Sequence, residues 1–312
     1  MRFKDSDIFS AVAAAATTYN EGFNERTYPD IGLNKFLTLT QKGDAGDDEI
    51  AYGEVSGTHD LDGGFIDENT TSIELSSVNY TAQKAPYIAW QKGAIYTDLA
   101  VSRALRLGES LDATELSNLE REAYLAAQRV ALIGSKQKTN LHGLLTHPRI
   151  KTQDLSSCKA IAEMNGAELR DFFLKIVELG YDNNGGMVQP STIVLGCTDL
   201  RAAALKFDAT LGTQNANISA VTAIKAALKD SGVDIEILGV PFGLARGISK
   251  KTANRVAIYS NREDVVSADW SIVPTALEPI RKDTGYSVSI LAKYTGAIIR
   301  QLDKVAYIDY KA

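Results

Sequence analysis

Residues 46–80 form a long polar stretch with the pattern of a β-hairpin that has too few apolar side chains to fold alone. Asp62-Gly63-Gly64 separates two β-prone runs, and Asp-Gly is a strong turn signal because both central residues of the favoured hairpin turn need positive φ. An isolated two-stranded ribbon is marginal in water, so a long one with thin apolar alternation needs a surface to lie on. A second copy of the same chain is the natural surface, which points to assembly rather than chemistry.

The expected assembly contacts fall within this ribbon. Gly63, Gly64 and the region near Pro86 are candidate hinges because a ribbon that reaches a neighbour needs points at which it turns. The candidate assembly residues are Tyr52, Asp62, Gly63, Gly64, Phe65 and Ile66.

Bulk composition sets limits on the partners. The chain has 312 residues, 45% of them hydrophobic, which is ordinary for a globular protein. No segment approaches the roughly 20 apolar residues of a membrane span, so we expect no membrane partner. The net charge of -6 argues against tight, sequence-independent binding of nucleic acid over the whole surface.

Helical periodicity is clearest after residue 112. Apolar positions recur at intervals of three and four residues, which predicts a spine helix with one buried stripe. About 22 residues give a rod of roughly 33 Å. The stripe consists of Leu116, Leu119, Ala123, Ala126, Val130 and Ile133. Two further helices are predicted, one from near Tyr96 to Gly108 and one at Ala167–Leu179 with Gly180 behind it.

From about residue 190 to 260 the pattern becomes β-α-α-β followed by another strand, which predicts a compact α/β lobe inserted into a larger one. The strands are STIVLG, DIEILGV and RVAIYS, and the helices are TDLRAAALKF and SAVTAIKAALKDSG. The last fifty residues return to β character. The whole chain therefore reads as α+β.

No recognisable catalytic arrangement accompanies these elements. His142 and His147 lie five residues apart beside Gly143 and Pro148, which is wrong for a helical metal pair at i and i+4. The sequence has no Gly-x-Ser-x-Gly elbow and no phosphate-binding loop. Cys158 and Cys197 have no metal or disulfide spacing. We therefore expect no enzyme activity, no catalytic residue, no metal site and no cofactor.

The order of the parts resembles the major capsid proteins of tailed bacteriophages, which have the Hong Kong 97-type fold that encapsulins also use. The most specific stretch is Tyr96–Pro148, where the spine helix leads through Gly134 to Gly143-Leu144-Leu145. A similar Gly-Leu-Leu turn follows the spine helix in phage capsid proteins.

The resemblance implies a division of the chain and a set of partners. Copies would assemble as pentamers and hexamers into an icosahedral virion shell around double-stranded DNA, without sequence-specific binding, in the host cytoplasm. Portal and decoration proteins would be further partners. The implied parts are an N-terminal arm (1–45), an extended loop (46–80), a peripheral domain with the spine helix (81–190), an axial domain (191–259) and the C-terminal β part of the peripheral domain (260–312).

Two departures from the family pattern bear on assembly. Some members carry a scaffolding domain before the arm, and here we expect a separate scaffolding protein or unaided assembly. Some members cross-link through a lysine in the extended loop, but the sequence between Lys42 and Lys84 contains no lysine, so we predict no covalent cross-linking. Two alternatives stay open: an encapsulin-type compartment with the same fold, and an α/β enzyme whose site is assembled from scattered residues.

Overall fold

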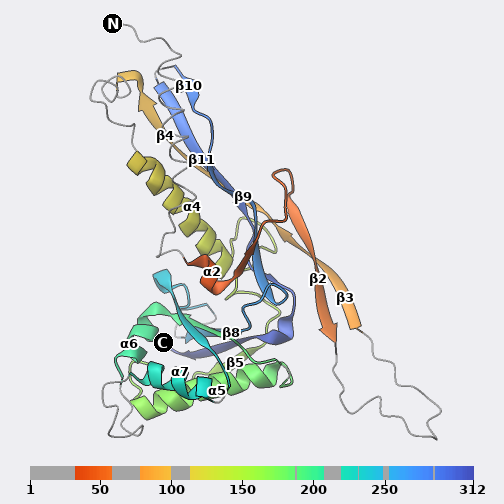
Figure 1. Cartoon of the computed structure of the whole chain (residues 1–312), viewed down its shortest axis with the longest axis vertical. Coiled ribbons are helices and arrows are strands. Elements are labelled where there is room, and N and C mark those ends of the chain that lie inside the picture. The colour runs from red at the N-terminus through yellow and green to blue at the C-terminus, as the bar shows by residue number, and fades with distance from the viewer. Residues whose placement is uncertain are drawn as a thin grey trace, which may run out of the picture.

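The structure is a computed structural model of the chain, and it describes residues 32–57, 78–99, 113–186, 188–206, 219–230, 232–248, 253–283 and 285–312. Within these residues the strands form a six-stranded sheet, a five-stranded sheet and a separate two-stranded ribbon. Helices cover both larger sheets (Figure 1). The predicted mixture of helix and sheet is confirmed.

The six-stranded sheet forms the elongated lobe of the molecule (Figure 1). β11 lies at its centre, antiparallel to both β4 and β9. Along β11 buried and half-buried residues alternate, as expected for a strand with one face on the core. Its strands are β1 (Thr38–Thr40), β4 (Ile88–Thr97), β9 (Val266–Ala276), β10 (Ile280–Lys282), β11 (Gly285–Tyr294) and β12 (Ile298–Ile299).

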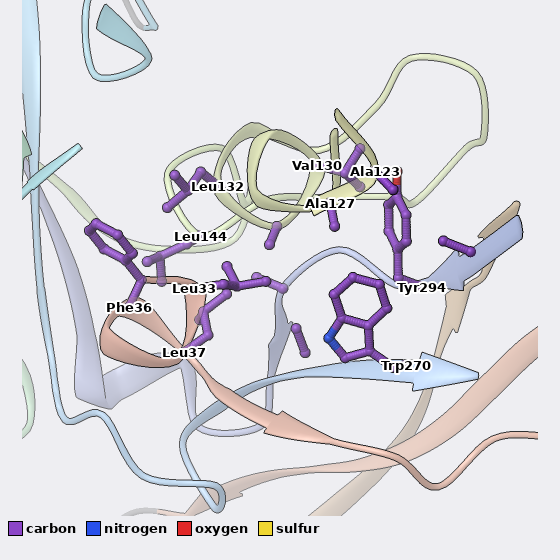
Figure 2. Close-up of a cluster of buried hydrophobic side chains, with 14 of the residues drawn as sticks. Leu33, Phe36, Leu37, Ala123, Ala127, Val130, Leu132, Leu144, Trp270 and Tyr294 are labelled. Atoms are coloured by element: carbon purple, nitrogen blue, oxygen red, sulfur yellow. The ribbon is translucent and has the colours of Figure 1, made fainter. Parts of the chain in front are cut away.

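The spine helix α4 (Ala113–Ile133) packs along this sheet and confirms the predicted stripe in most of its positions. Ala123, Ala127 and Val130 are buried and face Trp270 and Tyr294 of the sheet (Figure 2). The small alanine side chains let the aromatic rings approach the helix closely. The stripe differs from the prediction at two positions: Ala126 and Ile133 are only half-buried, while their neighbours Ala127 and Leu132 are buried.

The five-stranded sheet forms the second lobe, in the order β5-β13-β8-β6-β7. Residues on one of its faces, such as Ile193 and Ile258, join a hydrophobic cluster with α5 and α7. Residues on the other face, such as Val194 and Tyr259, join the cluster that contains α4. Burial on both faces explains why the inner strands read as continuous apolar runs.

Between residues 192 and 259 the elements match the predicted order of strand, helix, helix, strand and strand. The strands are β5 (Thr152–Leu155), β6 (Thr192–Gly196), β7 (Glu236–Val240), β8 (Ala253–Tyr259) and β13 (Val305–Lys311). The helices are α5 (Gly166–Asn183), α6 (Cys197–Ala204) and α7 (Ala220–Asp230), with the short 3₁₀ turns η2 (Pro241–Gly243) and η3 (Leu302–Lys304). No helix in the described part of the chain is both long and apolar enough to cross a membrane.

The strand pairing cuts across the predicted boundaries of the inserted lobe. β5 and β13 lie outside residues 191–259, yet both belong to the same sheet as β6, β7 and β8. β13 is an inner strand, parallel to β5 and antiparallel to β8. The lobe is therefore closed by strands from two distant parts of the chain.

The helix predicted from near Tyr96 begins two residues later, at Asp98, because β4 continues to Thr97 and pairs with β11 along its full length. Its remainder from residue 100 to Gly108 lies outside the described residues. The helix predicted at Ala167–Leu179 was wrong at its end. Gly180 does not end α5: the helix runs on to Asn183, and a Cβ at Gly180 would lie 2.7 Å from a methyl carbon of Ile258. Gly180 is present for close packing rather than as a helix stop.

The described part of the N-terminal arm packs on the body of the subunit. α2 (Leu33–Phe36) places Leu33 and Phe36 in the core, and Leu37 is fully buried beside them (Figure 2). β1 then pairs parallel with β9. Residues 32–40 therefore pack on their own subunit.

Candidate assembly surface

The predicted ribbon exists as β2 (Glu49–Gly57) and β3 (Val78–Pro86), an antiparallel pair in continuous register from Glu49↔Pro86 to Gly57↔Val78. Among the described residues, these two strands pair only with each other. The ribbon projects from the side of the body (Figure 1). The prediction of a ribbon is confirmed, but its end at residue 80 was wrong, because β3 runs on to Pro86. The other predicted assembly residues, Asp62, Gly63, Gly64, Phe65 and Ile66, lie outside the described part, so their role stays a prediction.

The two faces of the ribbon differ in exposure. On the first strand Ile50 and Tyr52 are half-buried and Glu54 is buried, so this face lies toward the body. Ala51 and Gly53 on the opposite face are exposed. The predicted assembly residue Tyr52 thus lies on the face toward its own subunit.

An ion pair attaches this inner face to the body. Arg149 Nη1 donates to Glu54 Oε1 at 3.0 Å, and Nη2 donates to the second carboxylate oxygen. Glu54 is only 7% exposed, and a two-point arginine–carboxylate contact fixes direction as well as distance. This contact holds the ribbon against the loop that follows α4. Sequence reasoning missed it because the partners are 95 residues apart and neither belongs to a motif.

Tyr52 lies beside the same charged group. Burial raises the pKa of its phenol, and the neighbouring Glu54 carboxylate raises it further, while Arg149 and Arg300 act in the opposite direction. The phenol is therefore neutral at physiological pH, and Tyr52 contributes packing and a hydroxyl rather than charge.

The loop that carries Arg149 is fixed by the glycines that the sequence singled out. Gly134 ends α4 with φ +73, a left-handed conformation suited to glycine. A Cβ at Gly143 would lie 2.3 Å from the backbone nitrogen of Ile133, so only glycine allows this crossing. Leu144 N and Leu145 N donate to the carbonyls of the helix end at 2.8 Å each. The Gly-Leu-Leu turn is thus bound rigidly to the spine helix.

A second exposed surface lies at the far end of the elongated sheet. Ile280 of β10 and Ile95 of β4 both pair with Ser287 of β11, so the three side chains form one row across a face. Ile280 is 63% exposed and Ile95 is 64% exposed. The opposite face carries Tyr286, which is buried toward the core. Single exposed apolar side chains are normal on a protein surface, so these two isoleucines do not by themselves mark a contact surface.

Catalytic geometry is not apparent on the described surface. His142 and His147 do meet, with ring centroids 5.3 Å apart, but edge to face. The pKa of His147 is lowered to about 4, chiefly by burial and also by the neighbouring His142 and Arg149. Within the described residues no group of three or more His, Cys, Asp or Glu side chains is arranged to hold a metal ion.

Comparison with solved structures places this architecture among capsids. The fold is similar to the capsid of Myoviridae phage XM1, with a TM-score of 0.68 at 12% identity over 89% of this chain and 92% of that chain. It is also similar to the capsid of a native GTA particle (TM-score 0.61, 11% identity, 92% of each chain). A third similar structure is a virus-like particle from Pyrococcus furiosus (TM-score 0.54, 14% identity, 96% of this chain and 98% of that chain).

At these identities the likeness shows the fold, which is the Hong Kong 97-type capsid fold. No curated protein matches the sequence. The family model described as "Major capsid protein" matches residues 62–310, which is well over half of the chain. The chain therefore belongs to the major capsid protein family, whose members form the shells of bacteriophage particles.

Proposed function

We propose that copies of this chain assemble as pentamers and hexamers into a closed icosahedral shell around phage double-stranded DNA, with each ribbon lying across a neighbouring subunit. The observation that carries this proposal is the ribbon itself. β2 and β3 pair with each other, are attached to the body on one face through Glu54, and expose the face that carries Ala51 and Gly53. A neighbour supplies the surface that an isolated ribbon needs.

The two lobes suggest how the subunit is placed in the shell. In this proposal the lobe built on the five-stranded sheet clusters around the symmetry axes, and the elongated lobe with α4 forms the peripheral domain. β5 and β13 then belong to the axial lobe, in addition to residues 191–259. Many weak contacts repeated by symmetry give a stable shell without any single strong interface.

Further proposed partners follow from the same role. The negative net charge suits a shell that encloses DNA without gripping it. A separate scaffolding protein, a portal and decoration proteins complete the particle in this proposal, and assembly takes place in the host cytoplasm. The shell is held without covalent cross-links, because the ribbon sequence between Lys42 and Lys84 has no lysine.

Electron microscopy of the purified protein is the direct test. Uniform closed shells, with nuclease-resistant DNA in particles from infected cells, support the proposal. Shells that instead contain a co-purified enzyme indicate an encapsulin-type compartment. A discrete small oligomer that forms no shell, even with candidate scaffolding proteins, contradicts the assembly proposal. That result favours the alternative of an α/β enzyme. A ladder above the monomer on a denaturing gel of intact particles would refute the absence of cross-links.

A further inference from the structure

A buried carboxylate lies at the point where the ribbon joins the body. Asp269 is on β9, in the six-stranded sheet, and its side chain is fully buried. Burying a carboxylate costs free energy unless hydrogen bonds compensate for the lost hydration. The donors around Asp269 therefore show which segments it binds.

Four donors satisfy this one side chain. Oδ1 accepts from Thr40 Oγ1 at 2.5 Å and from Lys42 N at 3.0 Å. Oδ2 accepts from Tyr87 Oη at 2.6 Å and from Gly43 N at 3.2 Å. Two of the donors are the backbone amides of Lys42 and Gly43. Each needs an acceptor oxygen, and a side chain of another shape or charge at position 269 cannot supply both.

The donors come from the two segments that lead into and out of the ribbon. Residues 40–43 precede β2. Tyr87 is the single residue between the end of β3 and the start of β4, and its backbone nitrogen donates to Asp48 O at 2.9 Å. Both ends of the ribbon are therefore bound to one group on a strand more than 180 residues away in sequence.

The fit around Tyr87 leaves little freedom. Tyr87 is fully buried, and a Cβ at Gly43 would lie 2.1 Å from its hydroxyl oxygen, so only glycine fits there. Lys293 Nζ lies 5.8 Å from the centre of the Tyr87 ring and donates to Ala45 O at 2.9 Å. The segment before β2 and the residue after β3 are thus packed together as well as hydrogen-bonded.

We propose that Asp269 is the positioning residue that fixes the angle at which the ribbon leaves the subunit, and hence the direction in which it meets its neighbour. This inference rests on the proposed role of the ribbon in assembly. It differs from the expected hinge near Pro86, because the residue that follows Pro86 is held rather than free to swing. Subunits in a closed shell repeat one contact geometry, so loss of this constraint changes the uniformity of the shells.

Two variants isolate the effect. Asp269→Asn keeps the shape but places an amide group where one pair of donors points, so a backbone N–H loses its acceptor. Tyr87→Phe keeps the ring packing and removes a single hydrogen bond, so it tests the same joint if the asparagine variant does not fold. The matched control is Tyr310→Phe, which removes a buried hydroxyl that donates to Asp199 Oδ2 at 2.5 Å in the second lobe, away from the ribbon and from the loop that carries Arg149.

Amide hydrogen exchange of the unassembled subunit and electron microscopy of assembled particles are the two measurements. We expect Tyr87→Phe to raise exchange in residues 40–57 and 78–87 by roughly fivefold to tenfold, with α4 unchanged. Asp269→Asn should have the larger effect and give shells of mixed diameter. Tyr310→Phe should leave ribbon exchange and shell diameter unchanged.

The outcomes separate the inference from the function on which it rests. The inference is overturned if the wild type forms shells and if Asp269→Asn and Tyr87→Phe also give uniform shells with unchanged ribbon exchange. That result leaves the proposed function intact. A uniform rise of exchange over the whole subunit also overturns the inference, because Asp269 would then act only in general stability. Failure of the wild-type chain to form shells contradicts the proposed function itself.

Discussion

Arg255 and Asp309 form a buried ion pair between directly opposite residues of β8 and β13. Arg255 Nε lies 2.7 Å from Asp309 Oδ1, and Nη2 lies 3.0 Å from Oδ2. The third guanidinium nitrogen donates to Leu145 O at 2.9 Å, and the group lies over the Tyr307 ring. The pair therefore ties the turn after the spine helix to the sheet of the second lobe.

Breaking this pair should be strongly destabilising. Arg255→Met leaves the Asp309 carboxylate buried without its partner, and we expect a loss of about 3–5 kcal/mol in the free energy of unfolding. Arg255→Lys keeps the positive charge but loses the two-point contact of the guanidinium with Asp309. Its loss of unfolding free energy should therefore be intermediate. Urea unfolding of the unassembled subunit measures both. The control is Arg262→Met, which breaks an exposed pair with Asp264 and should cost below about 1 kcal/mol. Equal losses of unfolding free energy in Arg255→Met and Arg262→Met would contradict a stabilising role for the buried pair.

Glu54→Gln should loosen the ribbon without unfolding the subunit. The amide cannot accept both arginine hydrogen bonds, so the ribbon loses its charged attachment to Arg149. Hydrogen exchange in residues 49–54 should rise, while α4 stays protected. Glu49→Gln is the matched control, since Glu49 pairs with Lys84 within the ribbon at 3.2 Å and both side chains are largely exposed. The idea fails if both variants change ribbon exchange equally.

Replacement of Phe65 and Ile66 by aspartate should block shell formation. If these residues contact a neighbour, charged side chains there disfavour the interface while the isolated subunit keeps its unfolding midpoint. Sedimentation analysis reports assembly, and circular dichroism reports folding. The conservative pair Phe65→Leu and Ile66→Val should still assemble. Unfolding of the isolated aspartate variant would show instead that both residues belong to the core of their own subunit.

Gly143→Ala should destabilise the subunit by more than about 1 kcal/mol, because the new methyl group meets the backbone of the helix end. Gly46→Ala is the control: nothing lies within 4 Å of a Cβ at that position, and its φ is not positive. Thermal unfolding of the two variants distinguishes them. A neutral effect at Gly143 would mean that the crossing of loop and helix can relax.

Stability should fall on acidification through the His147 side chain. The pKa of His147 is lowered from 6.5 to about 4 in the folded chain, so the unfolded state binds the extra proton first. The contribution of His147 is present above about pH 6.5 and is lost as the pH falls toward 4, by an amount on the order of 3 kcal/mol. Unfolding of His147→Gln between pH 7 and pH 4 should show a shallower pH slope than the wild type. Identical slopes would exclude this role.

The sequence predicts local patterns well because they depend on near neighbours. The apolar spacing of α4 and the alternation of strands and helices from 192 to 259 each need only a few adjacent residues. β4 was not predicted, because residues such as Tyr96 take their strand conformation from pairing with β11, which lies nearly two hundred residues further on. The ribbon was predictable as a hairpin, but its attachment was not. Asp269 and Arg149 acquire their roles only from partners that the fold brings together, and a single acidic or basic residue carries no signal of that.

The position of β13 inside the second lobe has a consequence for the order of folding during synthesis. β5, β6, β7 and β8 all leave the ribosome well before the strand that separates β5 from β8 has been made. Until then β5 has no partner strand in this sheet and β8 lacks its neighbour on one side, and long-range closure of this kind is slow. We expect chaperones to protect nascent chains from aggregation at this stage. Subunits that lack β13 should fail to mature, which limits the pool from which shells can form to fully translated chains.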